Sequence, residues 1–123
     1  MTRTALNVRY EPESARECFE PGGAAEAVEA TLSVIQGRWK ITIVFLLFAH
    51  EVLRYSDFSR LIPDLSERVL TKQLKALEED GLVTRTVYPT VPPKVEYRLT
   101  ERGQGLRPAL IALRDWMHGT QHA

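Results

Sequence analysis

The sequence is poor in several features that would each point to a particular class of protein. It has one cysteine, Cys18, in 123 residues, which excludes an intrachain disulfide and suits a reducing compartment. Its sixteen basic and sixteen acidic side chains cancel, so net charge alone gives no reason to expect a polyanionic partner. The polar N-terminus lacks the apolar stretch of a signal peptide.

Long hydrophobic runs are also missing. The longest, "ITIVFLLFA" at 41–49, is about half of the roughly 20 residues that a bilayer span requires, so no membrane association is expected. It instead predicts a buried central helix over 40–50. Residues 1–22 combine scattered charge with proline and paired glycines and predict a flexible arm without regular structure. The remaining residues, 23–123, predict one mainly α-helical domain with a small β-hairpin.

The order of the expected elements is informative. Apolar residues at helical spacing predict a first helix over 24–35. Arg54 and Tyr55 suit a very short strand, Ser56 suits the N-cap of a helix that Pro63 stops, and Ser66 suits the N-cap of a second helix ending at Gly81. A short helix, a tight turn and a capped second helix form a helix-turn-helix. In DNA-binding proteins with this motif, the second helix enters the major groove.

Two alternating strands and a last helix follow. Residues 82–88 and 95–99 predict a hairpin, and the prolines at 89, 92 and 93 belong at its tip because proline cannot donate to a strand ladder. Thr100 is expected to cap a last helix that Pro108 kinks near Gln104. The hairpin would act as a wing beside the helix-turn-helix.

Charge on the second helix is sorted against the helix dipole, with bases early and the acids of "EED" at 78–80 late. Three leucines share one face and the bases lie nearly opposite. This order suits a leading end that approaches phosphate, although a solvated face on an ordinary amphipathic helix is the plainer alternative. The residues predicted to contact DNA are Ser66, Arg68, Thr71, Lys72 and Lys75 on the helix, with Arg85 and Lys94 on the wing.

These residues resemble a known family, the HxlR-type winged helix-turn-helix transcriptional regulators. The resemblance covers roughly 26–116 and is carried by "GRW" at 37–39, "RYSDFSRLIPDLSERVLTKQLKALEEDGLVTR" at 54–85 and "VYPTVPPKVEYRLTERGQGL" at 87–106. It implies a winged helix-turn-helix fold, with three core helices plus the wing, in a cytoplasmic homodimer. That dimer binds a pseudo-palindromic operator on double-stranded DNA.

The resemblance also implies that the first and last helices build the dimer interface. Their apolar stripes look large for a domain of this size to cover alone, although packing within one chain is the alternative. The residues predicted for the interface are Val28, Leu32, Ile35, Leu106, Leu110, Leu113, Trp116 and Met117. Many family members carry Cys-Pro before the first helix and sense oxidants with that cysteine, but this chain has Glu26 and Ala27 there, so Cys18 is expected to be an inert thiol.

Other classes of function were weighed against this prediction. An enzyme or a metal protein is disfavoured, because the three histidines have no spaced Cys, Asp or Glu to complete a site and no nucleophile or phosphate-loop motif occurs. No cofactor is expected. A winged helix that binds an acidic protein instead of DNA remains an alternative. A small-molecule effector bound between the Trp39 region and the last helix is a further alternative, near Phe45, Phe48 and Trp116.

Overall fold

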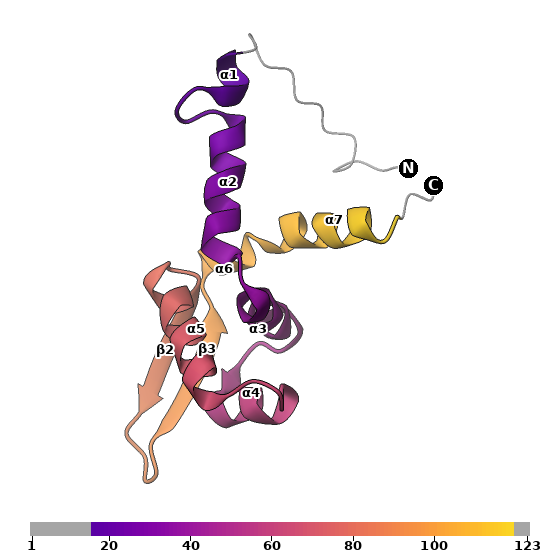
Figure 1. The fold of residues 1–123 in the computed structure, drawn as a ribbon. Coiled ribbons are helices and arrows are strands. Elements are labelled where there is room, and N and C mark those ends of the chain that lie inside the picture. Colours follow the sequence, from indigo (N-terminus) through magenta and orange to yellow (C-terminus); the bar gives the residue numbers. More distant parts are fainter. Residues whose placement is uncertain (1–15, 120–123) are drawn as a thin grey trace. The chain divides into compact units, whose positions relative to one another are not determined.

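The computed structural model describes residues 16–119, so the greater part of the predicted flexible arm lies outside the described residues. The described elements are α1 (Arg16–Phe19), α2 (Ala24–Ile35), α3 (Arg38–Ala49), β1 (Leu53–Arg54), α4 (Tyr55–Leu61), α5 (Glu67–Glu79), β2 (Val83–Tyr88), β3 (Lys94–Leu99), α6 (Glu101–Gln104) and α7 (Arg107–Met117) (Figure 1). The chain divides into two compact units between Gln36 and Gly37, a later boundary than the predicted one at residue 22.

The first unit contains α1 and α2. Helix α1 lies inside the segment for which no regular structure is predicted, so that prediction is wrong for 16–19. The chain turns between the two helices at Gly22, whose φ of 83° favours glycine, and Gly23 packs so closely on the carbonyl groups of Glu17 and Glu20 that a Cβ would not fit. Helix α2 spans the predicted residues.

The second unit is built around α3 and α5, which pack on each other and on the sheet (Figure 1). Its core is made of side chains that are nearly inaccessible to solvent. They come from these elements, from α4 and α7, and from the connecting turns: Ile43, Val44, Leu47, Leu53, Phe58, Ile62, Leu65, Leu70, Leu74, Leu77, Leu82, Val83, Tyr97 and Leu110. The apolar run at 41–49 therefore lies in a core helix, as predicted. Burial of such a set of apolar side chains supplies the main favourable term for folding.

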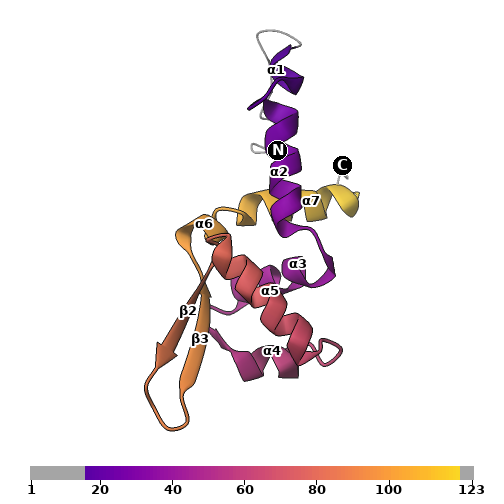
Figure 2. The same cartoon turned by 60° about the vertical axis from the view of Figure 1, so that its left-hand side comes forward.

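The sheet has three antiparallel strands in the order β1-β3-β2. The hairpin pairs Val83 with Leu99 at its base and Tyr88 with Lys94 near its tip, and β1 pairs Leu53 with Tyr97 on the other side of β3. The three prolines lie in the connection at 89–93, as predicted, and the hairpin extends past the helices at that end (Figure 2). Mainly helical structure with a small sheet confirms the predicted fold class.

Two local predictions differ from the structure. The helix at 55–61 begins one residue before Ser56, because the carboxylate of Asp57 accepts a hydrogen bond of 2.8 Å from the backbone N–H of Arg54 and thereby caps the helix. The last helix is divided into α6 and α7 rather than kinked. Pro108 lies in the first turn of α7, where its missing N–H leaves no helical bond unmade.

Candidate nucleic-acid interface

Helix α5 presents opposite faces of opposite character. Ser66 caps it as predicted, its Oγ accepting a hydrogen bond of 3.2 Å from the N–H of Val69, and Gly81 closes it with a φ of 78°. The leucines at 70, 74 and 77 are completely or almost completely buried. The predicted DNA-contacting residues of this helix, Ser66, Arg68, Thr71, Lys72 and Lys75, are all exposed to solvent. The structure therefore turns the cationic face outward.

Tyr55 connects the two helices of the helix-turn-helix. Its hydroxyl donates a hydrogen bond of 2.9 Å to the backbone carbonyl of Glu67 and lies 2.7 Å from Oγ1 of Thr71. The tyrosine belongs to the first turn of α4 and both partners belong to α5. Sequence reasoning missed this residue, because it assigned Tyr55 to a strand and the contact spans sixteen residues.

The wing and α5 enclose one hollow of about 230 Å³, which is lined by Thr71, Leu74, Lys75, Glu78, Arg85 and Tyr97. Arg85, exposed on β2, is thereby placed beside the middle of α5. Of the predicted contact residues, the structure brings Thr71, Lys75 and Arg85 together at this hollow. Two segments that are distant in sequence therefore bring cations to one hollow, which Glu78 also lines.

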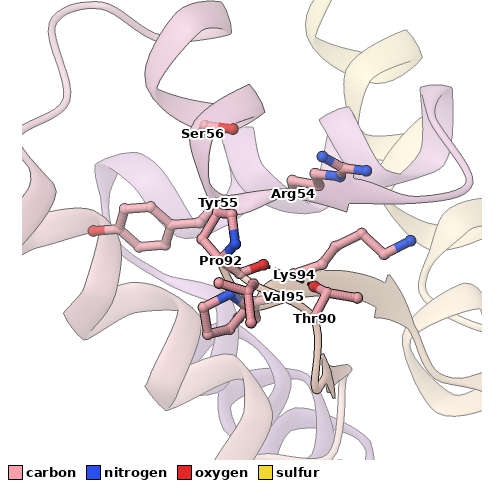
Figure 3. A pocket seen from close by; sticks show the side chains of 9 residues that line it. Arg54, Tyr55, Ser56, Thr90, Pro92, Lys94 and Val95 are labelled. Carbon is pink, nitrogen blue, oxygen red and sulfur yellow. Dashed lines mark hydrogen bonds between the residues drawn. The ribbon is translucent and has the colours of Figure 1, made fainter.

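A second hollow, of about 490 Å³, lies between the start of α4 and the tip of the wing (Figure 3). It is lined by Arg54, Tyr55, Ser56, Thr90, Val91, Pro92, Pro93, Lys94 and Val95. The side chains of Arg54 and Lys94 extend toward the same side, and the Tyr55 hydroxyl points away from both (Figure 3). Arg54 is a cation that sequence reasoning did not assign to the interface.

Lys94 is more engaged than the other predicted cations. It is half-buried, its Nζ lies 3.8 Å from Oε2 of Glu96, and the same atom lies 4.7 Å from the ring centroid of Tyr88. The Glu96 carboxylate also pairs with Arg98 at 3.3 Å. Lys94 therefore offers a partly neutralised charge, and we expect it to contribute less to polyanion binding than an exposed lysine of α5.

The residues predicted for a dimer interface fall into two groups in the single chain. Val28, Leu32, Leu113, Trp116 and Met117 are exposed, Trp116 and Met117 by more than three quarters of their surface, and Leu106 is half-buried. Ile35 and Leu110 are only 2% and 4% exposed. Their burial is already provided within one chain, so packing within the chain, the alternative to dimerisation, accounts for these two.

The region considered for a small-molecule effector contains a hollow of about 200 Å³ between α3 and α7. Its lining residues are Phe45, Phe48, Ala49, Arg107, Ile111 and Arg114, which include two of the predicted aromatic residues but neither tryptophan. The guanidinium of Arg107 lies 5.8 Å from the ring centroid of Phe48. The volume is below the roughly 300–1,000 Å³ typical of sites for drug-sized ligands.

The remaining predictions concern Cys18, metals and membranes. Cys18 lies on α1, half-buried, in the first unit. Within 16–119, no three His, Cys, Asp or Glu side chains are grouped so that they could hold a metal ion. In the same part of the chain, no single helix is long and apolar enough to cross a bilayer. The segments Glu17–Ile35 and Arg38–Ala49 have the length and apolar composition of a membrane span only when they are combined.

Comparison with known protein families gives one clear match. The model of the family described as "HxlR-like helix-turn-helix" matches residues 34–123. Among curated proteins, the HTH-type transcriptional regulator YybR of Bacillus subtilis is 47% identical over 92 residues, which cover 72% of this chain and 70% of that protein. An HTH-type transcriptional regulator of Methanothermobacter thermautotrophicus is 44% identical over 96 residues, covering 76% and 72%.

Solved structures give the same result. The reduced form of the redox regulator HypR superposes with a TM-score of 0.71 at 42% identity, covering 78% of this chain and 94% of that one. The HTH-type transcriptional regulator ytcD superposes with a TM-score of 0.70 at 45% identity, covering 78% and 97%. The matched region of the family model begins at residue 34, so Cys18 lies outside it.

Proposed function

The chain belongs to the HxlR-like helix-turn-helix family and is a transcriptional regulator of the helix-turn-helix type. On that premise we propose that it acts as a homodimer on a pseudo-palindromic operator. Helix α5 of each protomer enters a major groove, and the wing lies along the sugar–phosphate backbone. We place it in the cytoplasm, where bacterial and archaeal regulators such as its relatives meet the chromosome, and we propose a regulatory and not a catalytic role.

One observation carries the proposal: Lys75 on the exposed cationic face of α5 and Arg85 on the wing line the same hollow, which Glu78 also lines. The whole chain has no net charge, so this concentration of cations on one surface is local. The acidic residues at 78–80 lie at the far end of α5, away from its capped N-terminus. Basic residues near the N-terminus of α5 would attract DNA phosphates if this end of the helix approaches the DNA.

The predicted contact residues divide by chemistry. Arg68 and Thr71 are the base readers, because they lie in the first turns of α5, and Arg68 can form a bidentate pair with guanine. Lys72, Lys75, Arg85 and Lys94 contact phosphates, which fixes orientation without specifying sequence. Ser66 remains the cap of α5, and this role places the free backbone N–H groups of the first turn toward a phosphate.

The exposed apolar residues of α2 and α7 support the homodimer. Trp116 is 77% exposed and Met117 is 76% exposed, and side chains of this size are usually covered in a functional protein. Together with Val28, Leu32 and Leu113 they form the proposed interface. A twofold dimer would hold two copies of α5 about 34 Å apart, which is the separation of successive major grooves on one side of DNA.

Fluorescence anisotropy with DNA from the region flanking the gene tests the proposal. We expect saturable binding that is weaker for a duplex of scrambled sequence. Arg68→Ala should weaken operator binding by about 1–3 kcal/mol and relax the preference at one base pair. Arg102→Ala is the matched control, because Arg102 is an exposed arginine on α6, at the end of the hairpin away from its tip (Figure 2).

Two results would contradict the proposal. If the wild-type protein bound all duplexes equally and with no dependence on salt, the cationic face would serve a protein partner, the alternative considered above. If Arg68→Ala and Arg102→Ala behaved alike on the operator, the reading surface would lie elsewhere. Analytical ultracentrifugation at the concentrations used for binding tests the homodimer separately.

A further inference from the structure

The contacts of Tyr55 determine which oxygen carries each hydrogen. The Tyr55 oxygen lies 2.9 Å from the carbonyl oxygen of Glu67. Two oxygens at this distance require a hydrogen between them, and a carbonyl has none to give, so the single hydrogen of the tyrosine points at Glu67. The Tyr55 oxygen also lies 2.7 Å from Oγ1 of Thr71, and that contact needs a hydrogen too. The only one left belongs to Thr71.

Thr71 consequently donates to Tyr55 and has no second hydrogen to offer. A threonine hydroxyl carries one O–H donor and two acceptor lone pairs, so the remaining hydrogen-bonding capacity of Oγ1 is that of an acceptor alone. Thr71 is exposed to solvent on the face of α5 that carries the cations. A free threonine would accept or donate according to the base it met. This one is restricted by its neighbour on α4.

We propose that Tyr55 makes Thr71 an obligate hydrogen-bond acceptor toward DNA, so that Thr71 selects a base with an exocyclic amino group. The inference rests on the proposed function, since it requires α5 to lie in a major groove. In that groove the amino groups are N6 of adenine and N4 of cytosine, whereas O6 and N7 of guanine and O4 of thymine are acceptors. Thr71 should thus favour adenine or cytosine on the strand it faces and disfavour guanine or thymine.

Tyr55 is a positioning residue in this arrangement and does not need to touch DNA. Its ring belongs to the first turn of α4, and its hydroxyl holds both a backbone group and a side chain of α5. Without that hydroxyl, the Thr71 side chain is free to rotate. One available partner is then the carbonyl of Glu67 four residues earlier, as Thr31 bonds to Ala27 at 2.9 Å in α2. In the first case Thr71 can donate as well as accept, and in the second it remains an acceptor whose lone pairs point in another direction.

The experiment selects bound sequences from a pool of duplexes with randomised base pairs and counts them by sequencing. It uses the full-length wild-type protein, Thr71→Val, Thr71→Ser and Tyr55→Phe. For the wild type we expect one position in each half-site where adenine or cytosine exceeds guanine or thymine by about fivefold, the factor of one net hydrogen bond. Thr71→Ser should keep this preference because it keeps the hydroxyl. Thr71→Val, of similar shape but without an acceptor, should lose it.

Tyr55→Phe should reduce the preference at that position to about twofold or less while leaving the other positions unchanged. A thermal melt checks that this variant is folded. If it does not fold, the pair Thr71→Ser and Thr71→Val still decides whether Thr71 reads as an acceptor, because neither change touches the core.

Three outcomes would overturn the inference. Retention of the preference in Thr71→Val would show that Thr71 does not read this position. A wild-type preference for guanine or thymine that disappears in Thr71→Val would show that Thr71 donates. A folded Tyr55→Phe variant with unchanged preference would show that Tyr55 does not impose the acceptor role. If the wild type enriched no sequence at all, the proposed function itself would fail, which is a distinguishable result.

Discussion

The salt dependence of operator binding can be derived from the placement of the cations. Four side chains per protomer are assigned to phosphates: Lys72, Lys75, Arg85 and Lys94. The first three are exposed, and Lys94 is partly neutralised by Glu96 at 3.8 Å. A homodimer would thus make between six and eight phosphate contacts, and at about −0.9 per contact the slope of log K against log salt lies between about −5 and −7. Affinity should fall between about 10³-fold and 10⁴-fold from 50 to 200 mM salt.

Lys72→Gln provides the corresponding perturbation. It removes one exposed cation from each protomer, so the slope should become less steep by about 2, and the loss of affinity should be similar for operator and unrelated duplexes. Arg102→Gln, an exposed cation on α6, should leave the slope unchanged. Fluorescence anisotropy titrations at four or more salt concentrations measure both slopes. Equal slopes for Lys72→Gln, Arg102→Gln and wild type would refute the assignment of Lys72 to a DNA phosphate.

Further predictions concern stability and assembly. The backbone N–H of Arg54 lowers the pKa of Asp57 below its ordinary 3.8. Ionised Asp57 therefore stabilises the folded state above pH 3.8, and this contribution is lost as the pH falls through the lowered pKa. Asp57→Asn, which removes a negative charge near the start of α4, should therefore cost about 0.3–1 kcal/mol at pH 7, and denaturant melts should show the difference shrinking below pH 3.8. Gly103→Ala should cost about 1–3 kcal/mol, because the added Cβ would collide with the Leu82 carbonyl, and a melting temperature equal to that of wild type would contradict that packing. Trp116→Glu should weaken the proposed dimer without unfolding the chain, because Trp116 is 77% exposed; sedimentation as a stable dimer would exclude it from the interface.

The features that could be predicted from the sequence are those set by neighbouring residues. Ser66, the leucine spacing and Gly81 define α5, because capping, helical periodicity and the left-handed turn each depend on a few consecutive positions. The hairpin follows from alternation in 95–99 and from the prolines at its tip. The family was also identified correctly, since its motifs lie within these segments.

The features that were missed depend on contacts between distant segments. The Tyr55 hydroxyl meets Thr71 only after α4 and α5 have packed, and nothing in the local pattern around Tyr55 signals that bond. The burial of Leu110 is likewise a tertiary property, since its spacing with Leu113 fits an exposed interface equally well. The start of α4 was misplaced because the adjacent residues Ser56 and Asp57 can both help to cap a helix. In the structure Asp57 does so, by accepting a hydrogen bond from the backbone N–H of the N-cap residue, Arg54.

Tyr97 lies at the centre of the sheet and has a mechanical consequence. It is opposite Leu53 on one side and Arg85 on the other, and its ring contacts Phe58 of α4 edge-to-face with centroids 6.0 Å apart. The wing and helix α4 are therefore packed against each other through Tyr97. In the proposed dimer, a change in the separation or tilt of the two protomers' helix-turn-helix and wing would alter DNA binding. A displacement of about 3.4 Å, one step of the duplex, would put the second protomer out of register with its half-site.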